Sequence, residues 1–287
     1  MLSAAVLIVS SAAIMIRYAQ AEGVQSITIA AWRLTIAAAI LWPLTLAKAS
    51  NEIGALTKRE WLLGVLAGLF LAVHFASWIS SLAYTSVASS VALVSTNPLW
   101  IALVSWLLFR ERLGGWLVVG IVAAITGSAC IFLSDAGLLQ DVGGSNPMLG
   151  NALAVVGSLT VCGYLLIGRR LRKSISLLPY IWLVYSSAAV TLMIAALASG
   201  AILIGFSTLA WACLIGLAVG PQLLGHSAFN WALKHVTATF VAIVILGEPI
   251  GSALLAWLIF DERFAPLQLV GFAMLLVGIY LASRGEG

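Results

Sequence analysis

The sequence predicts an all-α integral membrane protein with ten transmembrane helices, arranged as two inverted five-helix repeats around a central cavity. Three observations lead to this prediction: the composition, a series of long apolar segments, and an internal repeat. Of 287 residues, 62% are hydrophobic and 8% are charged, whereas soluble domains contain about 25% charged residues. A soluble fold of this size cannot bury so much apolar surface in one core, so we expect a lipid environment.

Ten apolar segments are long enough to cross a membrane, because a spanning helix needs about 20 mostly apolar residues. Pro147, Pro179 and Pro266 stand where segments begin, and a proline in the first turn of a helix costs no hydrogen bond. No Lys or Arg precedes the first apolar run, so we expect a true first helix and not a cleaved signal peptide. The predicted spans are residues 1–20, 27–47, 61–83, 87–109, 115–134, 147–169, 177–199, 206–232, 237–260 and 266–283.

The positive charges are distributed unequally between the two sides of this ten-span arrangement. Only Arg17, Arg33 and Arg263 fall on one side, and cytoplasmic loops are the ones that carry an excess of Lys and Arg. The prediction is therefore a multi-pass protein of the cytoplasmic (inner) membrane with both termini in the cytoplasm. The residues on the predicted cytoplasmic side are Lys48, Lys58, Arg59, Arg110, Arg112, Arg169, Arg170, Arg172, Lys173, Lys234 and Arg284.

The chain lacks the motifs of an enzyme. It has no Walker-type phosphate loop, no HExxH zinc helix and no GxSxG elbow. The three cysteines lie singly inside predicted spans, without the spacing of metal ligands. We therefore expect no enzymatic activity, cofactor, metal site, nucleic-acid partner or ATPase subunit. The expected partners are a small-molecule substrate and the lipid bilayer.

The sequence contains an internal repeat. A shift of 151 residues places Pro98 on Pro249, and the segment from Pro98 to Arg112 then matches the segment that ends at Arg263. The Pro, Ala-Leu, Trp-Leu, Phe and Glu-Arg positions coincide in register, and glycines further along coincide as well. Coincident Leu and Ala are expected by chance in apolar sequence, but coincident Pro, Trp, Glu-Arg and Gly are not.

The number of spans in each repeat predicts how the two copies are oriented. Five spans is an odd number, so the second copy must enter the membrane upside down. The prediction divides the chain into a first repeat, residues 1–140, and a second, inverted repeat, residues 141–287, within one membrane domain. Secondary transporters are commonly built this way, with the substrate site at the repeat interface near the midplane of the bilayer.

The Pro-x(12)-Glu-Arg module, present twice and followed each time by a Gly-containing helix, resembles the EamA-type family, the ten-helix branch of the drug/metabolite transporter superfamily. The resemblance is strongest over residues 82–128 and 233–279, with Arg33 as a further match. It implies ten helices, cytoplasmic termini and a central cavity that opens alternately to either side. Within this family the chain is most similar to exporters of aromatic and other neutral amino acids, but the family also contains drug, purine and sugar-phosphate carriers.

Three prolines are predicted hinges. Pro98 and Pro249 lie at the centres of two spans, at matching positions of the repeats, and Pro221 lies in the middle of a third span. A proline inside a helix removes a backbone hydrogen bond and kinks the helix. Interruptions at corresponding places in two halves point to a transporter's binding site. The alternative is a kink that only shapes packing.

Polar residues recur at helical spacing in the eighth span. Gln222, His226 and Asn230 are four residues apart and should form one polar stripe. Such a stripe must face protein or water, because unpaired polar groups in lipid cost several kcal/mol. His74 corresponds to His226 in the repeat if a gap of one residue is allowed, and it shares a helix face with Trp78. We predict that these residues line the cavity; hydrogen bonding between helices is the alternative.

Two tryptophans lie away from the span ends. Trp78 and Trp100 therefore differ from the tryptophans that anchor helices at membrane interfaces. An aromatic wall in a polar cavity suits a ligand that has both apolar and charged parts, so we predict that both rings contact substrate. The alternative is that they fill the core of the helix bundle.

Glu248 is a carboxylate placed near the bilayer midplane, immediately before Pro249. Ionisable residues at such depth usually pair, face water or relay protons. Its repeat partner is Asn97, which is polar but cannot ionise, and both are predicted cavity residues. Glu248 either binds the substrate's ammonium group or carries a coupling proton; the alternative is a structural hydrogen bond, for instance with Arg33.

The functional prediction is a secondary transporter that exports small neutral, chiefly aromatic, amino acids from the cytoplasm by alternating access. An exporter of drugs or other metabolites is the alternative within the same class. A membrane channel or sensor is the alternative from a different class, because polar residues inside a helix bundle are compatible with both.

Overall fold

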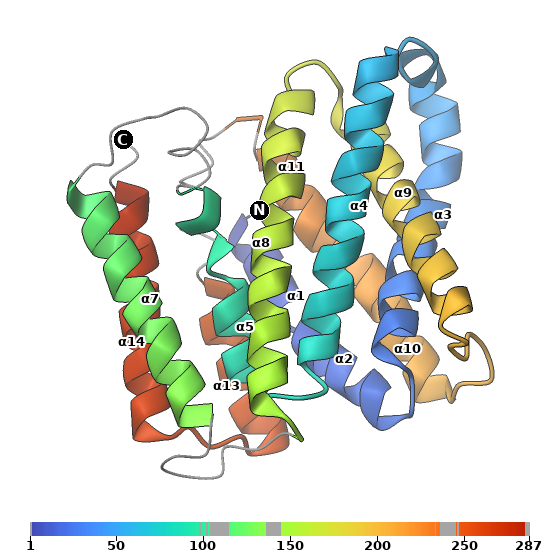
Figure 1. Cartoon of the computed structure of the whole chain (residues 1–287). Coiled ribbons are helices and arrows are strands. Elements are labelled where there is room, and N and C mark those ends of the chain that lie inside the picture. The colour runs from blue at the N-terminus through green and yellow to red at the C-terminus, as the bar shows by residue number, and fades with distance from the viewer. Residues whose placement is uncertain are drawn as a thin grey trace.

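The computed structural model describes residues 2–97, 99–101, 103, 115–135, 145–232, 234–235, 245 and 247–284, and the regular structure of this part of the chain is helical (Figure 1). The helices are α1 (Leu2–Ser10), α2 (Ala12–Ala21), α3 (Ser26–Gly54), α4 (Lys58–Ser81), α5 (Val87–Val94), α7 (Gly115–Asp135), α8 (Pro147–Leu171), α9 (Leu177–Ala198), α10 (Thr208–Leu217), the π-helix η1 (Ala218–His226), α11 (Ser227–Ala232), α13 (Gly247–Phe260) and α14 (Pro266–Arg284).

The helices coincide with the apolar segments of the sequence. Six helical stretches in the described part of the chain are long and apolar enough to span a membrane, and shorter apolar helices accompany them. The six stretches are Leu2–Ala21, Ser26–Gly54, Lys58–Ser81, Pro147–Leu171, Leu177–Ala198 and Thr208–Ala232. Much of their surface is apolar side chain that stays exposed in the isolated chain, as expected for helices that face lipid.

The first span is not one regular helix, as the sequence predicted, but two helices that meet at Ser11. The Ser10 hydroxyl donates to the carbonyl of Val6 at 2.8 Å, and the Ser11 hydroxyl donates to the carbonyl of Ile8 at 2.7 Å. Hydroxyls that bond back to carbonyls in the preceding turn compete with the helix ladder and bend helices. Two adjacent serines with this bonding account for the break between α1 and α2.

The second span is longer than predicted. Its helix, α3, continues past the expected end at residue 47 and stops at Gly54, so charged residues that were expected in a loop are helical. The helix then has its last two turns beyond the apolar segment, where Glu52 accepts hydrogen bonds from the backbone N–H and the hydroxyl of Ser176, both at 2.6 Å. The next helix starts at a capping box, in which Thr57 and Glu60 each bond the other's backbone N–H.

The eighth span is interrupted by a π-helix. Residues Ala218–His226 have π-helical hydrogen bonding between the α-helices α10 and α11, and Pro221 lies inside this stretch. A π-helix bonds residue i to residue i+5, so it inserts extra residues into the turn and changes which side chains share a face. Such interruptions are frequent at functional sites, and this one shifts Gln222 out of line with Asn230.

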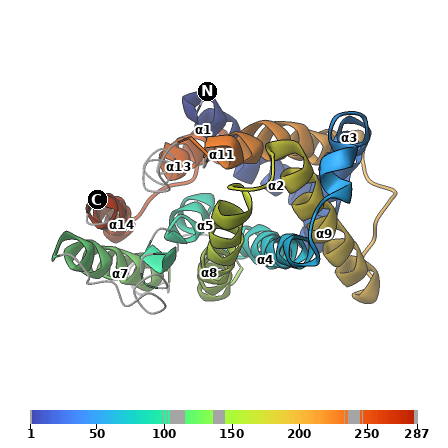
Figure 2. The ribbon, with the colours of Figure 1, turned by 90° about the horizontal axis from the view of Figure 1, so that it is seen from above.

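The helices stand in two rows when the molecule is viewed from above (Figure 2). One row contains α1, α11 and α13, and the other contains α4, α5 and α8. α3 and α9 close one end of the rows, and α7 pairs with α14 at the opposite end. This arrangement leaves the space between the two rows as the place where side chains from both parts of the chain meet.

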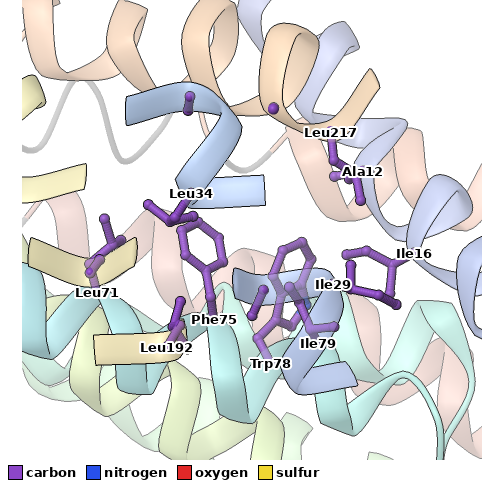
Figure 3. Packing of buried hydrophobic residues seen from close by; sticks show 14 of the residues in the cluster. Ala12, Ile16, Ile29, Leu34, Leu71, Phe75, Trp78, Ile79, Leu192 and Leu217 are labelled. Atoms are coloured by element: carbon purple, nitrogen blue, oxygen red, sulfur yellow. The ribbon is translucent and has the colours of Figure 1, made fainter. Parts of the chain in front are cut away.

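The main apolar core fills the end of the molecule near α3 and α9. Phe75 and Trp78 project from one side of α4, where Figure 3 shows Leu34 and Ile29 of α3 close to them. All four side chains are almost fully buried. Trp78 belongs to this core and, as described below, also lines the cavity.

α7 and α14 pack through small residues at two reciprocal places. A Cβ atom on Gly127 would lie 2.6 Å from the carbonyl oxygen of Gly271, and a Cβ atom on Gly278 would lie 2.7 Å from that of Gly120. The two backbones can approach this closely only because these positions carry no side chain. This is the small-residue packing common between helices in membranes.

Candidate functional site

A cavity lies between the two rows of helices. Its empty volume is about 1020 Å³ with the open end included, and it is lined from α4, α8, η1, α11, α13 and the segment that follows α5. Most of the lining is apolar and aromatic, with a few polar groups that converge on the interior. A concave, mostly apolar site with a small number of placed polar groups is the usual form of a small-molecule binding site.

His74 is a fixed part of the cavity wall. Its Nδ1 lies 2.9 Å from the carbonyl oxygen of Gly157, and because a carbonyl can only accept, Nδ1 is the donor. In the neutral ring Nε2 is then a free acceptor. The imidazole also stacks on the Trp78 indole, with ring centres 6.1 Å apart and planes 16° apart. His74 and Trp78 therefore form a stacked aromatic pair with a polar edge.

Asn230 is the centre of a hydrogen-bonded group on the opposite wall. The Tyr164 hydroxyl donates to Oδ1 of Asn230 at 2.8 Å, and Nδ2 of Asn230 donates to the carbonyl of His226 at 3.0 Å. The hydroxyl of Tyr185 lies 3.3 Å from that of Ser227 in the same region. These bonds join α8, α9 and α11, so the polar groups here are held by three helices.

His226 and Glu248 complete the polar lining. His226 sits between two phenylalanine rings, edge-on to Phe75 at 5.5 Å and to Phe229 at 6.2 Å. Glu248, in the first turn of α13, is half-buried and lines the cavity. The ion pair found among the described residues joins Asp261 to Arg263. Glu248 is not part of it, so no cation of the described residues lies within 4 Å of this carboxylate. A carboxylate without a cation in an apolar cavity is available to a charged ligand.

The structure brings six of the eight predicted cavity residues together. His74, Trp78, Asn97, His226, Asn230 and Glu248 all line the cavity. Gln222 does not; its Oε1 accepts a hydrogen bond from Nε of Arg33 at 2.9 Å, away from the lining, because the π-helix turns it off the face that carries Asn230. Trp100 is half-buried and donates from Nε1 to the Thr96 hydroxyl at 3.0 Å, also outside the lining.

The predicted hinges have different surroundings. Pro221 lies inside η1 and Pro249 is buried near the start of the described part of α13, whereas Pro98 lies outside the described residues. Glu248 forms no ion pair with Arg33 within 4 Å, although the two charges interact electrostatically over a longer distance. The π-helix around Pro221 means that this span is irregular over more than one turn.

The two ends of the cavity differ. At the end of α8, the lining includes Arg169, whose side chain is exposed. At the opposite end Trp78 is 3% exposed, and hydrogen bonds tie the helix ends together. Arg17 donates from Nη1 to the carbonyls of Leu82 at 2.8 Å and Thr85 at 3.2 Å. Within the described residues, the end of the cavity beside Arg169 is therefore exposed, and the end beside Trp78, here called the closed end, is buried.

Several residues of the site were not predicted from the sequence. Tyr164, Phe229 and Arg169 line the cavity, and Arg33 lies against its aromatic wall. A tyrosine in the middle of an apolar span was a usable signal, since its hydroxyl needs a partner there. Arg33 gave a stronger one, because an arginine seven residues into a spanning helix needs a protein or ligand partner.

A helical bundle that crosses the membrane several times and encloses a polar, aromatic cavity is the architecture of proteins that move small molecules across bilayers. The family model described as the EamA-like transporter family matches residues 1–133 and 148–284. The chain belongs to the EamA-like transporter family, and it is a multi-pass membrane protein of that family.

Individual relatives agree with this assignment. A protein of Clostridium kluyveri described as an uncharacterized transporter is 21% identical over 229 residues, which cover 79% of this chain and 71% of the relative. An uncharacterized transporter of Archaeoglobus fulgidus is 26% identical over 227 residues, 78% of this chain and 76% of the relative. A crystal structure with 18% sequence identity superimposes with a TM-score of 0.68, covering 97% of this chain and 93% of the other, and shows the likeness of fold alone.

Proposed function

We propose that this protein is a secondary transporter that exports small neutral, chiefly aromatic, amino acids across the cytoplasmic membrane by alternating access. The observation that carries the proposal is the cavity itself. It places an aromatic pair, His74 with Trp78, in the same space as the carboxylate of Glu248, and among the described residues one end of it is exposed and the other is buried. A site closed at one end is what a carrier needs, because a carrier never opens to both sides together.

The packing of α7 against α14 supports the proposed inverted repeats, residues 1–140 and 141–287. The shift of 151 residues relates Gly127 to Gly278 and Gly120 to Gly271. The contact of Gly127 with Gly271 thereby corresponds to the contact of Gly278 with Gly120. A pair of contacts that exchange under the repeat is what a two-fold axis between the halves produces. The family model matches two stretches of nearly equal length, which supports two copies of one unit.

The positive-inside rule gives the direction of transport in this proposal. Both termini and the connections after α3 and α8 are assigned to the cytoplasm, because positive charges gather there: Lys58 and Arg59 begin α4, Arg170 lies in the last turn of α8, and Lys173 follows it. The open end of the cavity beside Arg169 then faces the cytoplasm. An exporter in this state is ready to take substrate from inside the cell.

The lining supports the proposed substrate class. An aromatic ring of the substrate can stack on His74 and Trp78, and such contacts contribute about 0.5–1.5 kcal/mol beyond the area they bury. The ammonium group of an amino acid is a cation that can approach Glu248, which has no cation within 4 Å in the described part of the chain. Asn97, which also lines the cavity, offers an uncharged hydrogen-bonding group to the rest of the substrate.

The test is flux into liposomes that contain the purified protein. Labelled phenylalanine, tryptophan, leucine and a cationic dye are offered in turn, with and without unlabelled phenylalanine inside. We expect saturable uptake of the aromatic amino acids and acceleration by internal phenylalanine, because a carrier exchanges substrate. Uptake of the dye in place of amino acids would favour a drug exporter, and unsaturable flux without exchange would favour a channel; either result contradicts the proposal.

A further inference from the structure

Arg33 is a fully buried cation next to the closed end of the cavity. Its side chain has 0% exposure on α3. The guanidinium carbon lies 4.1 Å from the centre of the Phe75 ring and 6.0 Å from the centre of the Trp78 ring. Nε donates to Oε1 of Gln222 at 2.9 Å. The group is thus held between α3, α4 and η1 by one hydrogen bond and two aromatic faces.

Two nitrogen atoms of the guanidinium make no hydrogen bond with the described residues. Within the described residues, Nη1 and Nη2 of Arg33 are buried and have no hydrogen-bond partner. Nε2 of Gln222 and Nε1 of Trp78 are likewise buried without an acceptor in this part of the chain. The described residues also hold no carboxylate within 4 Å of Arg33, and Glu248 acts on it electrostatically only from farther away. A buried charge without a counter-ion in contact costs several kcal/mol, and each buried donor without an acceptor adds to that cost.

The unpartnered groups are all donors, and one of them is charged. What satisfies such a set is a ligand with several acceptor oxygens and a negative charge, since a guanidinium fork matches a carboxylate with two parallel hydrogen bonds. A cation or a neutral amine would leave the donors unpaired. The chemistry of the cluster therefore selects an anion, and a planar two-oxygen anion most closely.

We propose that Arg33, Gln222 and Trp78 form a carboxylate-binding site at the closed end of the cavity. This inference rests on the proposed transport function, and it adds which group of the substrate is recognised there. Trp78 lines the cavity, and the guanidinium carbon of Arg33 lies 6.0 Å from the centre of its ring. Arg33 therefore stands directly behind the cavity wall at Trp78, where a carboxylate that passes the aromatic rings meets its unpartnered donors.

The site adds a selection rule to the cavity. Glu248 presents a negative charge to the cavity, and Arg33 presents a positive charge behind its aromatic wall. A substrate with an amino group, a ring and a carboxylate satisfies all three features. A cationic amine without a carboxylate satisfies only two, and the positive charge of Arg33 opposes it further. The transporter should therefore reject simple aromatic amines that an apolar cavity with Glu248 alone would accept.

The test measures binding to the purified full-length protein by titration calorimetry with three probes. Phenylalanine has both charged groups, phenethylamine lacks the carboxylate and 3-phenylpropionate lacks the amine. We expect the wild type to bind phenylalanine at least tenfold more tightly than phenethylamine. We expect Arg33→Gln to weaken the binding of phenylalanine and of 3-phenylpropionate at least tenfold. The binding of phenethylamine should not weaken, because only the contacts with the carboxylate are lost.

Three further variants separate the site from a structural effect. Arg33→Lys keeps the charge but loses the fork, so it should recover part of the preference for carboxylates. Trp78→Phe keeps a ring but removes the Nε1 donor. It should therefore weaken the binding of the two probes that carry a carboxylate several-fold more than the binding of phenethylamine. Arg263→Gln makes the same change at an exposed arginine and should alter none of the three affinities. The melting temperature of each variant reports whether it folds.

The possible results distinguish this site from the proposed function. If the wild type binds 3-phenylpropionate but not phenylalanine, the carboxylate site stands and the amino-acid proposal fails. If phenylalanine binds and Arg33→Gln changes all probes equally or none, the site is overturned and the proposed function stands. The site is also overturned if no carboxylate binds, or if Glu248→Gln restores a melting temperature lost in Arg33→Gln, because the two charges then pair with each other.

Discussion

Glu262 accepts hydrogen bonds from the backbone N–H of Val87 with both carboxylate oxygens, each at 3.1 Å. Val87 is the first residue of α5, and Glu262 follows α13, so the contact joins the two proposed repeats. The N-terminus of a helix carries unsatisfied N–H groups and a partial positive charge, and both favour a carboxylate there. The contact lies at the end of the molecule where the cavity is closed, and it helps to hold that end shut.

Removing the charge of Glu262 should therefore open the closed end more often. A charge-assisted hydrogen bond contributes about 1.5–3 kcal/mol, and Glu262→Gln retains a neutral acceptor, so we expect a several-fold shift toward the alternative state. The measurement is the labelling rate of Val94→Cys, a cavity residue, in a chain without native cysteines. The impermeant thiol reagent is applied on the side that holds Ser145.

The neighbouring exposed carboxylate provides the control. Asp261 pairs with Arg263 at 3.8 Å on the surface, and such exposed pairs contribute about 0–1 kcal/mol. Asp261→Asn should leave the labelling rate of Val94→Cys unchanged. An equal rate in Glu262→Gln and the unsubstituted chain would mean that Glu262 caps α5 without any part in closing the cavity.

Gly127→Ala should lower the thermal stability of the protein. Alanine is the better helix former by about 1 kcal/mol, but here its Cβ would lie 2.6 Å from the carbonyl of Gly271 and 2.7 Å from the N atom of Leu275. Overpacking of this kind costs about 1–3 kcal/mol. Melting temperatures at one scan rate compare this variant with Gly115→Ala, whose Cβ would meet nothing within 4 Å. If both variants melt like the wild type, the two helices can move apart to accommodate the added Cβ without loss of stability, and the prediction is wrong.

Composition and hydropathy were sufficient to place most helices, because in lipid every spanning segment must be helical and about the same length. The predicted start at residue 147 and the predicted end at residue 83 lie within two residues of the observed Pro147 and Ser81. The end of α3 was missed because hydropathy marks where a helix leaves the lipid and not where it stops. The Thr57–Glu60 capping box was the better signal for that boundary.

The placement of site residues was predictable where they lie on a regular α-helix, and less so where the helix is interrupted. His74 and Trp78 lie on an unbroken helix, so their spacing placed them correctly on one face. Gln222 does not line the cavity with Asn230, because the π-helix changes which residues share a helix face. The spacing of residues in the sequence does not reveal the hydrogen bonds that make this stretch a π-helix. Arg33 was noted as a family match and as a possible partner of Glu248, but its partners Phe75 and Gln222 were not predicted, since they come from α4 and η1, far away in the sequence.

Trp78→Ala should reduce transport affinity more than Trp100→Ala. Trp78 lines the cavity and stacks on His74, so its removal takes away an aromatic contact worth about 1 kcal/mol or a fivefold change in KM. Trp100 bonds Thr96 outside the lining, and its variant should change KM less than twofold. Phenylalanine exchange in liposomes measures both. Equal effects would place Trp100 on the substrate path in another state of the cycle.

The proposed orientation can be tested at two exposed positions on opposite ends of the bundle. Ala55 follows α3 and Ser145 precedes α8, and both are exposed. In whole cells an impermeant thiol reagent should label Ser145→Cys and should not label Ala55→Cys until the cells are opened. The native cysteines are replaced in both variants. Labelling of Ala55→Cys in intact cells would reverse the orientation and the direction of transport.

The last prediction concerns Glu248, which lines the cavity and has no cation within 4 Å in the described residues. An ionisable group at such depth is costly unless it pairs, faces water or relays protons, so we expect it to take part in transport. Glu248→Gln keeps the size and one acceptor of the side chain and removes its charge. A role in binding the ammonium group predicts about tenfold weaker affinity for phenylalanine, with or without an imposed pH gradient. A role as proton carrier predicts that exchange continues while the response to the gradient disappears.

The two roles of Glu248 separate when exchange and net flux are measured in the same liposomes. Exchange of labelled for unlabelled phenylalanine needs only the binding step, whereas net flux against a gradient needs the coupled proton. Asn97→Asp supplies a comparison, because it places a carboxylate at the matching position of the other repeat, which also lines the cavity. In the chain that also carries Glu248→Gln, it should restore part of the lost activity if a negative charge in the cavity is what transport requires. Wild-type exchange and wild-type gradient response in Glu248→Gln alone would leave Glu248 a structural residue and contradict both roles.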